Sequence, residues 1–272
     1  MKNNVVFITG ASSGIGYSTA KILANNGYKV YGGGRRLDKL NSLKEFGVTP
    51  IKLDVTDNFS RNKAINQIIK KEGTIDGLIN NAGYGSYGAL ENVSIEEAKK
   101  QMEVNVFGMI ELTKLVLPYM RKQKYGKIIN ISSIGGKMVS YFGGWYHASK
   151  YSVEALSDAL RMETKKFGIK VAIIEPGGIK TNWGMIAANQ LINSSKNTVY
   201  QKEALKAGNG MKKQYNGNGL SSPNVVAKKI LKAMNKKNPK TRYVMGTAAK
   251  PGVIMHALLP TKLFDFIMMH VS

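Results

Sequence analysis

The sequence predicts an α/β fold in which one doubly wound, parallel sheet of seven strands is covered by crossover helices. Short apolar runs alternate with helical patterns along the 272 residues, and this order is typical of a parallel sheet. A Gly-rich turn joins the first apolar run to the first helical pattern. No internal repeat, linker or shift of composition marks a second domain. A chain of this length can bury about three quarters of its unfolded surface in a single core.

Each element follows from its local pattern. The apolar runs that predict strands begin near Val5, Lys29, Thr49, Asp76, Lys127, Lys170 and Arg242. Helical periodicity predicts helices at about 14–26, 37–46, 59–71, 95–123, 146–167 and 224–235. Four glycines stand where helices should end, because glycine readily adopts the left-handed conformation that closes a helix. They are Gly27, Gly47, Gly73 and Gly168.

The turn after the first strand has the composition of an anion site. Free backbone N–H groups and the dipole of the following helix would point at a bound phosphate there. Gly10 would permit the tight turn, Gly14 the approach of a pyrophosphate, and Gly16 the packing of helix against strand. The spacing Gly-x-x-x-Gly-x-Gly differs from the commoner Gly-x-Gly-x-x-Gly, and an ordinary surface turn is the alternative. The turn reads Thr9-Gly10-Ala11-Ser12-Ser13-Gly14-Ile15-Gly16.

A second group of residues indicates acid–base chemistry on a carbonyl or alcohol group. Tyr146 and Lys150 lie on one face of a predicted helix, so the ammonium would favour the phenolate and lower a pKa that is ordinarily ~10. Ser133 would hold a carbonyl oxygen against the phenol. Ser132 is the alternative for the serine role, although the interval to Tyr146 favours Ser133. A half-buried tyrosine beside an extended lysine is the alternative for the pair.

Together these features resemble the classical short-chain dehydrogenase/reductase family, which has a Rossmann-type fold, over about residues 4–182. The resemblance implies that the turn binds a dinucleotide through Gly10, Ser12, Ser13, Gly14, Ile15 and Gly16. It implies further cofactor contacts at three later segments. These are the adenine-contacting pair Asp54 and Val55, the segment Asn81, Ala82 and Gly83 after the fourth strand, and the nicotinamide loop with Pro176, Gly177, Ile179 and Thr181.

The resemblance also implies a catalytic tetrad of Asn105, Ser133, Tyr146 and Lys150. Hydride passes between the nicotinamide and a carbonyl carbon while Tyr146 protonates the oxygen, and the reverse reaction oxidises a secondary alcohol. Lys150 would also bind the nicotinamide ribose. Asn105 would anchor a water that links Lys150 to solvent.

The end of the second strand predicts the choice of cofactor. An acidic residue there would bind the ribose hydroxyls of NAD, whereas arginine would neutralise the 2′-phosphate of NADP. The sequence offers Arg35 and Arg36, with no carboxylate before Asp38. It therefore favours NADP(H). The alternative is that these arginines, and Arg36 in particular, solvate the start of the next helix.

The substrate is expected to be lipophilic. In the resembled family the segment after the nicotinamide loop closes the pocket, and here that segment, about 183–223, is rich in large apolar residues. A helix pair that only covers the sheet edge is the alternative. A tail at 251–272 follows the catalytic region 1–250 and resembles the subgroup of hydroxysteroid and retinol dehydrogenases and acyl-dihydroxyacetone-phosphate reductases. This implies a steroid, retinoid, long-chain aldehyde or lipid ketone. A 3-oxoacyl thioester reductase and a non-catalytic NADP-binding regulator are alternatives.

Composition limits the partners. The chain has no cysteine, which excludes disulfides and thiolate metal sites, and its three histidines lack metal-ligand spacing, so no metal is expected. The net charge of +23 would attract nucleic acid or anionic lipid. No nucleic-acid module is recognisable, and no nucleic-acid partner is expected.

Lys250, Lys262 and the apolar tail favour peripheral contact with an anionic membrane instead. A groove cover or a dimer contact is the alternative for the tail. The resemblance implies a homodimer built from the helices at 95–123 and 146–167. The first strand follows the N-terminus without a secretory signal, which predicts a cytoplasmic protein.

Overall fold

The computed structural model describes residues 4–271 and contains a seven-stranded sheet in the order β3-β2-β1-β4-β5-β6-β7. All six neighbouring pairs are parallel, which confirms the predicted sheet. The strands are β1 (Val5–Thr9), β2 (Lys29–Gly34), β3 (Thr49–Lys52), β4 (Gly77–Asn80), β5 (Gly126–Ile131), β6 (Ile169–Pro176) and β7 (Arg242–Met245). The strand order reverses between β1 and β4, so their carboxyl ends border the crevice where open parallel sheets bind ligands.

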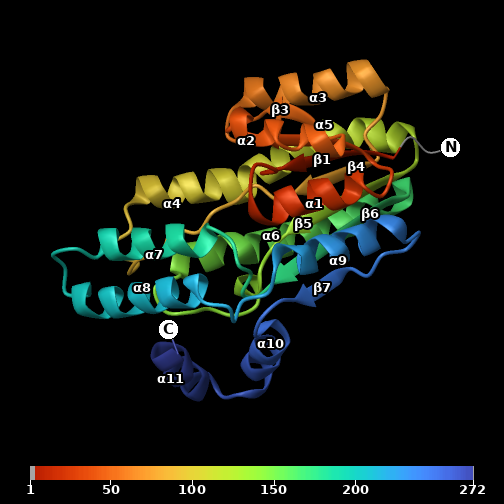
Figure 1. Ribbon diagram of the computed structural model, residues 1–272. Helices are drawn as coiled ribbons and strands as arrows, with labels where there is room; N and C mark the ends of the chain where they lie inside the picture. Colours follow the sequence, from red (N-terminus) through yellow and green to blue (C-terminus); the bar gives the residue numbers. More distant parts are fainter. Residues whose placement is uncertain (1–3, 272) are drawn as a thin grey trace.

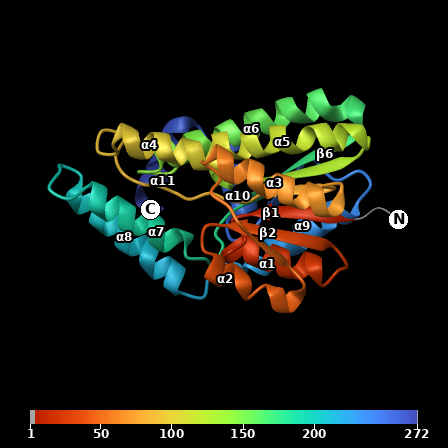
Figure 2. The ribbon, with the colours of Figure 1, turned by 90° about the horizontal axis from the view of Figure 1, so that it is seen from above.

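Helices cover both faces of the sheet (Figures 1 and 2). One face carries α1 (Gly14–Ala24), α2 (Leu37–Asn41) and α9 (Pro223–Asn235), and the other carries α3 (Asn58–Glu72), α5 (Gly108–Lys122) and α6 (Gly144–Thr164). Two further helices, α7 (Trp183–Ser194) and α8 (Gln201–Asn216), pack on each other beyond the strand ends. The single-domain, doubly wound architecture is as predicted.

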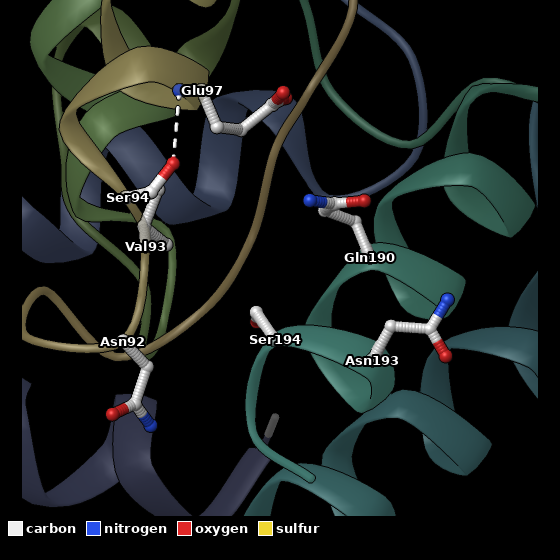
Figure 3. A pocket seen from close by; sticks show the side chains of 7 residues that line it. All are labelled: Asn92, Val93, Ser94, Glu97, Gln190, Asn193 and Ser194. Carbon is white, nitrogen blue, oxygen red and sulfur yellow. Dashed lines mark hydrogen bonds between the residues drawn. The ribbon is translucent and has the colours of Figure 1, made fainter.

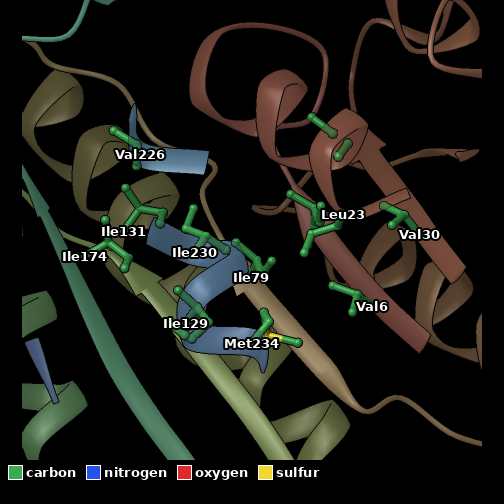
Figure 4. Packing of buried hydrophobic residues seen from close by; sticks show 14 of the residues in the cluster. Val6, Leu23, Val30, Ile79, Ile129, Ile131, Ile174, Val226, Ile230 and Met234 are labelled. Carbon is green, nitrogen blue, oxygen red and sulfur yellow. The ribbon is translucent and has the colours of Figure 1, made fainter. Parts of the chain in front are cut away.

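The two faces of β1 show why its sequence is apolar throughout. Successive side chains of a strand point to opposite faces, so Val6 and Ile8 enter the core beneath α1 and α9 while Val5 and Phe7 enter the core beneath α3 and α5. All four side chains are fully buried. Figure 4 shows the first of these cores, where α9 packs on the central strands. A strand buried on both faces is hydrophobic along its length rather than alternating.

The predicted helix at 95–123 is interrupted. It consists of α4 (Ile95–Met102), a π-helical segment η2 (Glu103–Phe107) and α5. Gly108, which follows the π-helical segment, lies close to the loop after β3, because a Cβ there would be 2.6 Å from the Val55 carbonyl oxygen. π-helical turns concentrate at functional sites, and this one contains Asn105. The predicted helix at 37–46 is likewise divided, into α2 and a 3₁₀ turn η1 (Lys44–Phe46).

The predicted helix ends are confirmed at the four glycines. Gly27, Gly47, Gly73 and Gly168 all have positive φ, between 72° and 82°. Beyond β7 the chain forms α10 (Ala249–Leu258) and α11 (Thr261–Val271), which lie at the edge of the molecule (Figure 1). α10 packs against β7 and a 3₁₀ turn η3 (Ile134–Gly136). Within residues 4–271, no helix combines the length and apolar character needed to cross a membrane.

Candidate active site

The four residues of the expected tetrad converge near the carboxyl ends of β4 and β5. Tyr146 and Lys150 lie one turn apart on α6, and each is 7% exposed. Lys150 Nζ donates a 2.9 Å hydrogen bond to the Ile131 carbonyl at the end of β5. A Cβ added to Gly83, after β4, would lie 3.0 Å from Asn105 Oδ1 and 3.7 Å from Lys150 Nζ. The loop after β4, the π-helical segment and α6 therefore meet at this point.

The two candidate serines face different surroundings. Ser133 Oγ accepts a 3.0 Å hydrogen bond from the Gly135 amide and shares a hydrogen bond with Tyr146. Ser132 is buried, and its hydroxyl has no hydrogen-bond partner among the described atoms. A Cβ on Gly136 would lie 2.8 Å from Ser132 Oγ and 2.9 Å from Glu154 Cγ, so Ser132 points towards Glu154. The geometry therefore agrees with the choice of Ser133.

Burial dominates the proton affinities of the pair on α6. It raises the pKa of Tyr146 well above its ordinary value of 10.0, and the hydrogen bond with Ser133 opposes that rise only in part. Burial lowers the pKa of Lys150 from 10.5 to about 8, while the Glu154 carboxylate acts in the opposite direction. The expected lowering of the Tyr146 pKa by Lys150 is therefore not found. Lys150 Nζ is bonded to a carbonyl and lies 5.9 Å from the centroid of the tyrosine ring.

The side chain of Asn105 connects the loop after β4 to α6 through hydrogen bonds. Its Oδ1 accepts from the Tyr84 amide at 3.0 Å, and its Nδ2 donates to the Tyr84 carbonyl at 2.9 Å and to Ser149 Oγ at 3.0 Å. Ser149 in turn donates to the Tyr146 carbonyl. Both amide hydrogens of Asn105 are therefore occupied. A water at this residue would have to donate to the remaining lone pair of Oδ1 or to the backbone carbonyl.

Two glycines of the Gly-rich turn are required by close approach. Gly10 has φ +68°, and a Cβ there would lie 2.9 Å from the Ala82 Cα. A Cβ on Gly16 would lie 2.4 Å from the Gly10 carbonyl oxygen. Thr9 Oγ1 accepts hydrogen bonds from the amides of Asn81 and Ala82, at 3.0 and 2.9 Å. The turn is therefore fastened to the segment after β4, as the expected dinucleotide site requires.

The nicotinamide loop of the sequence prediction lies against this turn. Pro176 ends β6, and the Gly177 amide donates to the Met245 carbonyl at 2.8 Å. Ile179 is buried and forms a bridge with Ser221. Thr181 approaches Gly14, whose Cβ would lie 3.1 Å from the threonine methyl group. Thr181 also accepts a hydrogen bond from the Trp183 amide, so the loop connects the turn to α7. Ile15 packs at the margin of the core under α1.

The arginines at the end of β2 line the approach to the turn. Arg36 Nη2 donates to Ser12 Oγ at 3.0 Å and to Ser13 Oγ at 3.1 Å. Arg36 therefore contacts the turn, which favours the predicted cofactor role over the alternative that it solvates the start of the next helix. Arg35 is exposed and acts electrostatically on Asp54 and Tyr84. Both arginines directly follow β2, and their contact with a 2′-phosphate stays a prediction.

Asp54 and Val55 follow β3 on the same side. Burial raises the pKa of Asp54, but hydrogen bonds from Thr56 and the charges of Arg35 and Arg61 outweigh it, so the net shift is downward. Asp54 Oδ1 accepts from the Thr56 amide at 3.0 Å and hydroxyl at 2.7 Å. The buried Val55 offers its carbonyl to Arg61 at 2.8 Å. Asp54 is therefore held ionised by its own loop.

Trp183 and Tyr87 pack on the ring of Tyr146 and are called the aromatic roof below. The ring of Trp183 lies 4.9 Å from the Tyr146 ring and that of Tyr87 lies 5.8 Å away, measured between centroids. Tyr215, on α8, contacts Trp183 at 6.4 Å. The apolar interpretation of the 183–223 segment agrees with this placement of α7 and α8. Tyr87 was not expected from the sequence, because a lone aromatic residue in a loop carries no periodic signal.

The segment between Ser133 and Tyr146, called the pocket wall below, is held in place by hydrogen bonds to His147. Its Nδ1–H donates to the Gly135 carbonyl and its Nε2 accepts from the Ser140 amide, both at 2.9 Å. Burial lowers the pKa of His147, although the carbonyl contact opposes the shift. A neutral imidazole with this tautomer satisfies both backbone groups.

A polar cleft of about 290 Å³ lies beside the roof, between the loop before α4 and α7 (Figure 3). Its lining includes Glu97 and Gln190, which project into the cleft from opposite sides. Ser194 donates to the Tyr87 carbonyl at 3.2 Å and so joins the cleft to the roof. Within the described residues, no three His, Asp or Glu side chains are grouped so that they could hold a metal ion.

Comparison with known proteins gives a consistent result. The family model for short chain dehydrogenase matches residues 4–190. The chain is 41% identical over 248 residues to a 3-ketodihydrosphingosine reductase of Bacteroides thetaiotaomicron, and 90% of this chain and 89% of the relative are covered. The crystal structure of a short-chain dehydrogenase from Streptomyces avermitilis gives a TM-score of 0.81 at 30% identity, with 94% of this chain and 93% of that chain covered. A metagenomic short-chain oxidoreductase in complex with NADP gives a TM-score of 0.62 at 29% identity, covering 64% of this chain and 82% of that chain.

Proposed function

The chain belongs to the short-chain dehydrogenase family of oxidoreductases, and we propose that it transfers hydride between NADP(H) and the carbonyl or secondary-alcohol carbon of a lipophilic substrate. One observation carries the proposal. A buried, protonated Tyr146 lies beside Ser133 and Lys150 and beneath an apolar roof, at the carboxyl edge of the sheet. This arrangement suits proton donation to an oxygen that is held away from water.

NADP(H) fits the residues at the approach to the site. The Gly-rich turn offers free amides at the start of α1 for a pyrophosphate. Arg35 and Arg36 would neutralise a 2′-phosphate, and the hydroxyls of Ser12 and Ser13 already face Arg36. A related short-chain oxidoreductase has been solved with NADP, which supports the same choice here.

The proposed roles of the site residues follow from their contacts. Bound NADPH would supply the hydride to the carbonyl carbon. Ser133 would donate its hydroxyl hydrogen to the carbonyl oxygen, and Tyr146 would protonate that oxygen as the alcohol forms. The raised pKa of Tyr146 keeps its proton in place at neutral pH, as the role of proton donor requires. Lys150 would supply positive charge beneath the phenol and bind the ribose, while Asn105 would fix the loop after β4 against α6.

The aromatic surroundings of Tyr146 support a lipophilic substrate. Tyr87 and Trp183 present ring surfaces to the phenol, and neither side chain carries a charge that would select an ionic substrate. A relative over most of the chain is named as a reductase of 3-ketodihydrosphingosine, a long-chain lipid ketone. We therefore place the preferred substrate among lipid ketones, and steroid ketones and long-chain aldehydes are the nearest chemical alternatives.

We also propose two contacts with other molecules, a homodimer interface and a membrane surface. Phe107 of η2 and Tyr151 and Met162 of α6 are exposed apolar side chains, which supports a homodimer through this region. The tail exposes Leu258 (76%) and Phe266 (59%), with the exposed Lys262 between them in sequence. Apolar side chains beside a lysine suit shallow insertion into an anionic membrane surface.

The test is NADPH and NADH oxidation by the purified protein against a panel of carbonyl compounds. The panel contains 3-ketodihydrosphingosine, steroid ketones, long-chain aldehydes and acetoacetyl thioesters, with Tyr146→Phe as the control. We expect turnover with NADPH and a lipid ketone that is lost in the variant. Turnover with the thioesters alone would replace the lipid assignment with the acyl-thioester alternative. Tight NADPH binding without turnover on the panel would contradict the proposed substrate class.

A further inference from the structure

Two glutamates are buried directly behind the proposed site. Glu154 lies on α6, one turn beyond Lys150, and is 5% exposed, while Glu175 lies on β6 and is 1% exposed. Glutamate is almost never buried to this degree unless it is paired. Glu154 Oε1 has no hydrogen-bond partner among the described atoms, and Glu175 Oε1 has only ion-pair contacts. The cost of burying these carboxylates is therefore only partly offset by hydrogen bonds and ion pairs.

The two glutamates share the same two cations. Arg242 Nε lies 3.1 Å from Glu154 Oε2 and 3.2 Å from Glu175 Oε1. Lys137 Nζ lies 3.1 Å from Glu154 Oε2 and 3.7 Å from Glu175 Oε1. Arg242 also contacts Asp158, one turn further along α6. Three carboxylates therefore compete for these cations.

Ionisation of the second carboxyl group of the pair is unfavourable. Burial and then the neighbouring Glu154 carboxylate raise the pKa of Glu175 to about 7, although Lys137 and Arg242 oppose the shift. Two carboxylates that share one site cannot both ionise easily, so one proton is retained between them. At neutral pH Glu175 is therefore protonated in about half of the molecules, and this fraction rises as the pH falls.

Glu154 lies one helical turn from a lysine whose charged form is disfavoured by burial. Lys150 has a pKa of about 8, and Glu154 is the group that raises it against burial. The charged groups facing the pair are Lys137 from the pocket wall, Arg242 from β7, and Lys150 and Asp158 from α6. A lone buried ammonium would be strongly disfavoured without a counter-charge.

We propose that Glu154 is a positioning residue whose buried carboxylate supplies the counter-charge to the Lys150 ammonium one turn before it on α6, and that Glu175, which shares Lys137 and Arg242 with Glu154, takes up a proton in preference to a second buried charge. The inference rests on the proposed function, because the charge of Lys150 matters through its assigned role. The pair also joins four elements near the site. Lys137 belongs to the pocket wall, Arg242 to β7, Glu175 to β6 and Glu154 to α6.

The direct test follows the protonation of both groups without cofactor. Carbon-13 NMR of protein labelled with [ε-¹³C]lysine and [δ-¹³C]glutamate gives the titration midpoints, with Lys150→Arg and Glu175→Gln used for assignment. We expect Lys150 to titrate near 8 and Glu175 near 7 in the wild type. Glu154→Gln should lower the Lys150 midpoint by about one pH unit and move the Glu175 midpoint to lower pH. Glu154→Asp keeps the charge and should restore much of the Lys150 midpoint.

The matched control is Glu163→Gln, an exposed glutamate on the same helix, which should move neither midpoint. An unchanged Lys150 midpoint in Glu154→Gln would overturn the inference. A midpoint that falls equally in Glu154→Asp would assign the effect to packing instead, and would also overturn it.

The pH dependence of kcat/KM with NADPH then connects the pair to activity. The alkaline limb should move to lower pH in Glu154→Gln and stay in place in Glu163→Gln. A shifted Lys150 midpoint in a wild-type protein that neither binds NADPH nor turns over would refute the proposed function alone. A normal alkaline limb in Glu154→Gln, in an active enzyme, would refute the link between this pair and activity.

Discussion

Glu175 should make the folded protein less stable as the pH rises from 5 to 8, and Glu175→Gln should remove that loss. Its carboxyl has an ordinary pKa of 4.5 and a folded-state pKa of about 7. Below both values the group is protonated in either state and has no effect. Between them the unfolded chain releases the proton while the folded chain keeps it, so the free energy of unfolding falls with rising pH. Above pH 7 the cost is complete.

The size of this effect follows from the two pKa values. A shift from 4.5 to about 7 corresponds to about 3 kcal/mol at 1.36 kcal/mol per unit. For a chain of 272 residues, that free energy corresponds to about 5 °C in the unfolding temperature. The side chain of Glu175 is 1% exposed, so little solvent screening reduces the shift.

The assay is thermal unfolding followed by circular dichroism at several pH values between 5 and 8. The unfolding temperature of Glu175→Gln, relative to wild type, should rise by about 5 °C across this interval. A constant packing cost of the amide cancels in that comparison. Glu163→Gln, exposed on α6, should keep a constant offset from wild type. A Glu175→Gln offset that is equally independent of pH would refute the reasoning.

Four other variants test the rest of the site and the tail. Tyr146→Phe should reduce turnover by a factor of about 10³ while NADPH binding stays within about twofold; equal loss of both would contradict its role as the proton donor. Arg36→Ala should weaken NADPH at least tenfold more than NADH, because a charge-assisted contact contributes about 1.5–3 kcal/mol; an unchanged preference would place the phosphate contact elsewhere. Trp183→Ala should raise KM for a long-chain ketone more than for a short one, as measured by steady-state kinetics, and a uniform rise would argue against a roof that contacts the substrate. The pair Leu258→Ser and Phe266→Ser should abolish co-sedimentation with vesicles containing phosphatidylserine, and full binding by this variant would exclude the tail as the contact.

The sheet could be predicted because its strands carry their own signal. Val5, Val6, Phe7 and Ile8 are all buried, so no polar residue interrupts the apolar run that marks β1. The glycines at helix ends carry a signal of the same local kind, since the left-handed conformation at Gly73 is a property of one residue. Tyr146 and Lys150 could be paired from spacing, because they share a helix face whatever packs on it, whereas Asn105 was predicted only from the family resemblance.

Other features depend on contacts between distant parts of the chain. The π-helical segment that contains Asn105 is accompanied by bonds to Tyr84 and Ser149, which lie 21 and 44 residues away in sequence. The pattern at 95–123 shows only helical periodicity, and it predicted one continuous helix. Arg36 contacts Ser12 and Ser13 across a similar interval, so its side-chain partners could not be predicted from the start of α2.

The proton affinities were the part of the site that spacing predicted least well, and their cause is burial. The roof that removes water from Tyr146 raises the cost of its phenolate and keeps it a proton donor. The same loss of water acts against the Lys150 ammonium, which the donor needs nearby. A site closed by α7 and α8 therefore requires a negative charge close to Lys150. Glu154 lies one turn away on the same helix and provides that charge. Below about pH 7, Glu175 keeps the pair from carrying a second buried charge, so the buried carboxylates and the roof are parts of one electrostatic arrangement.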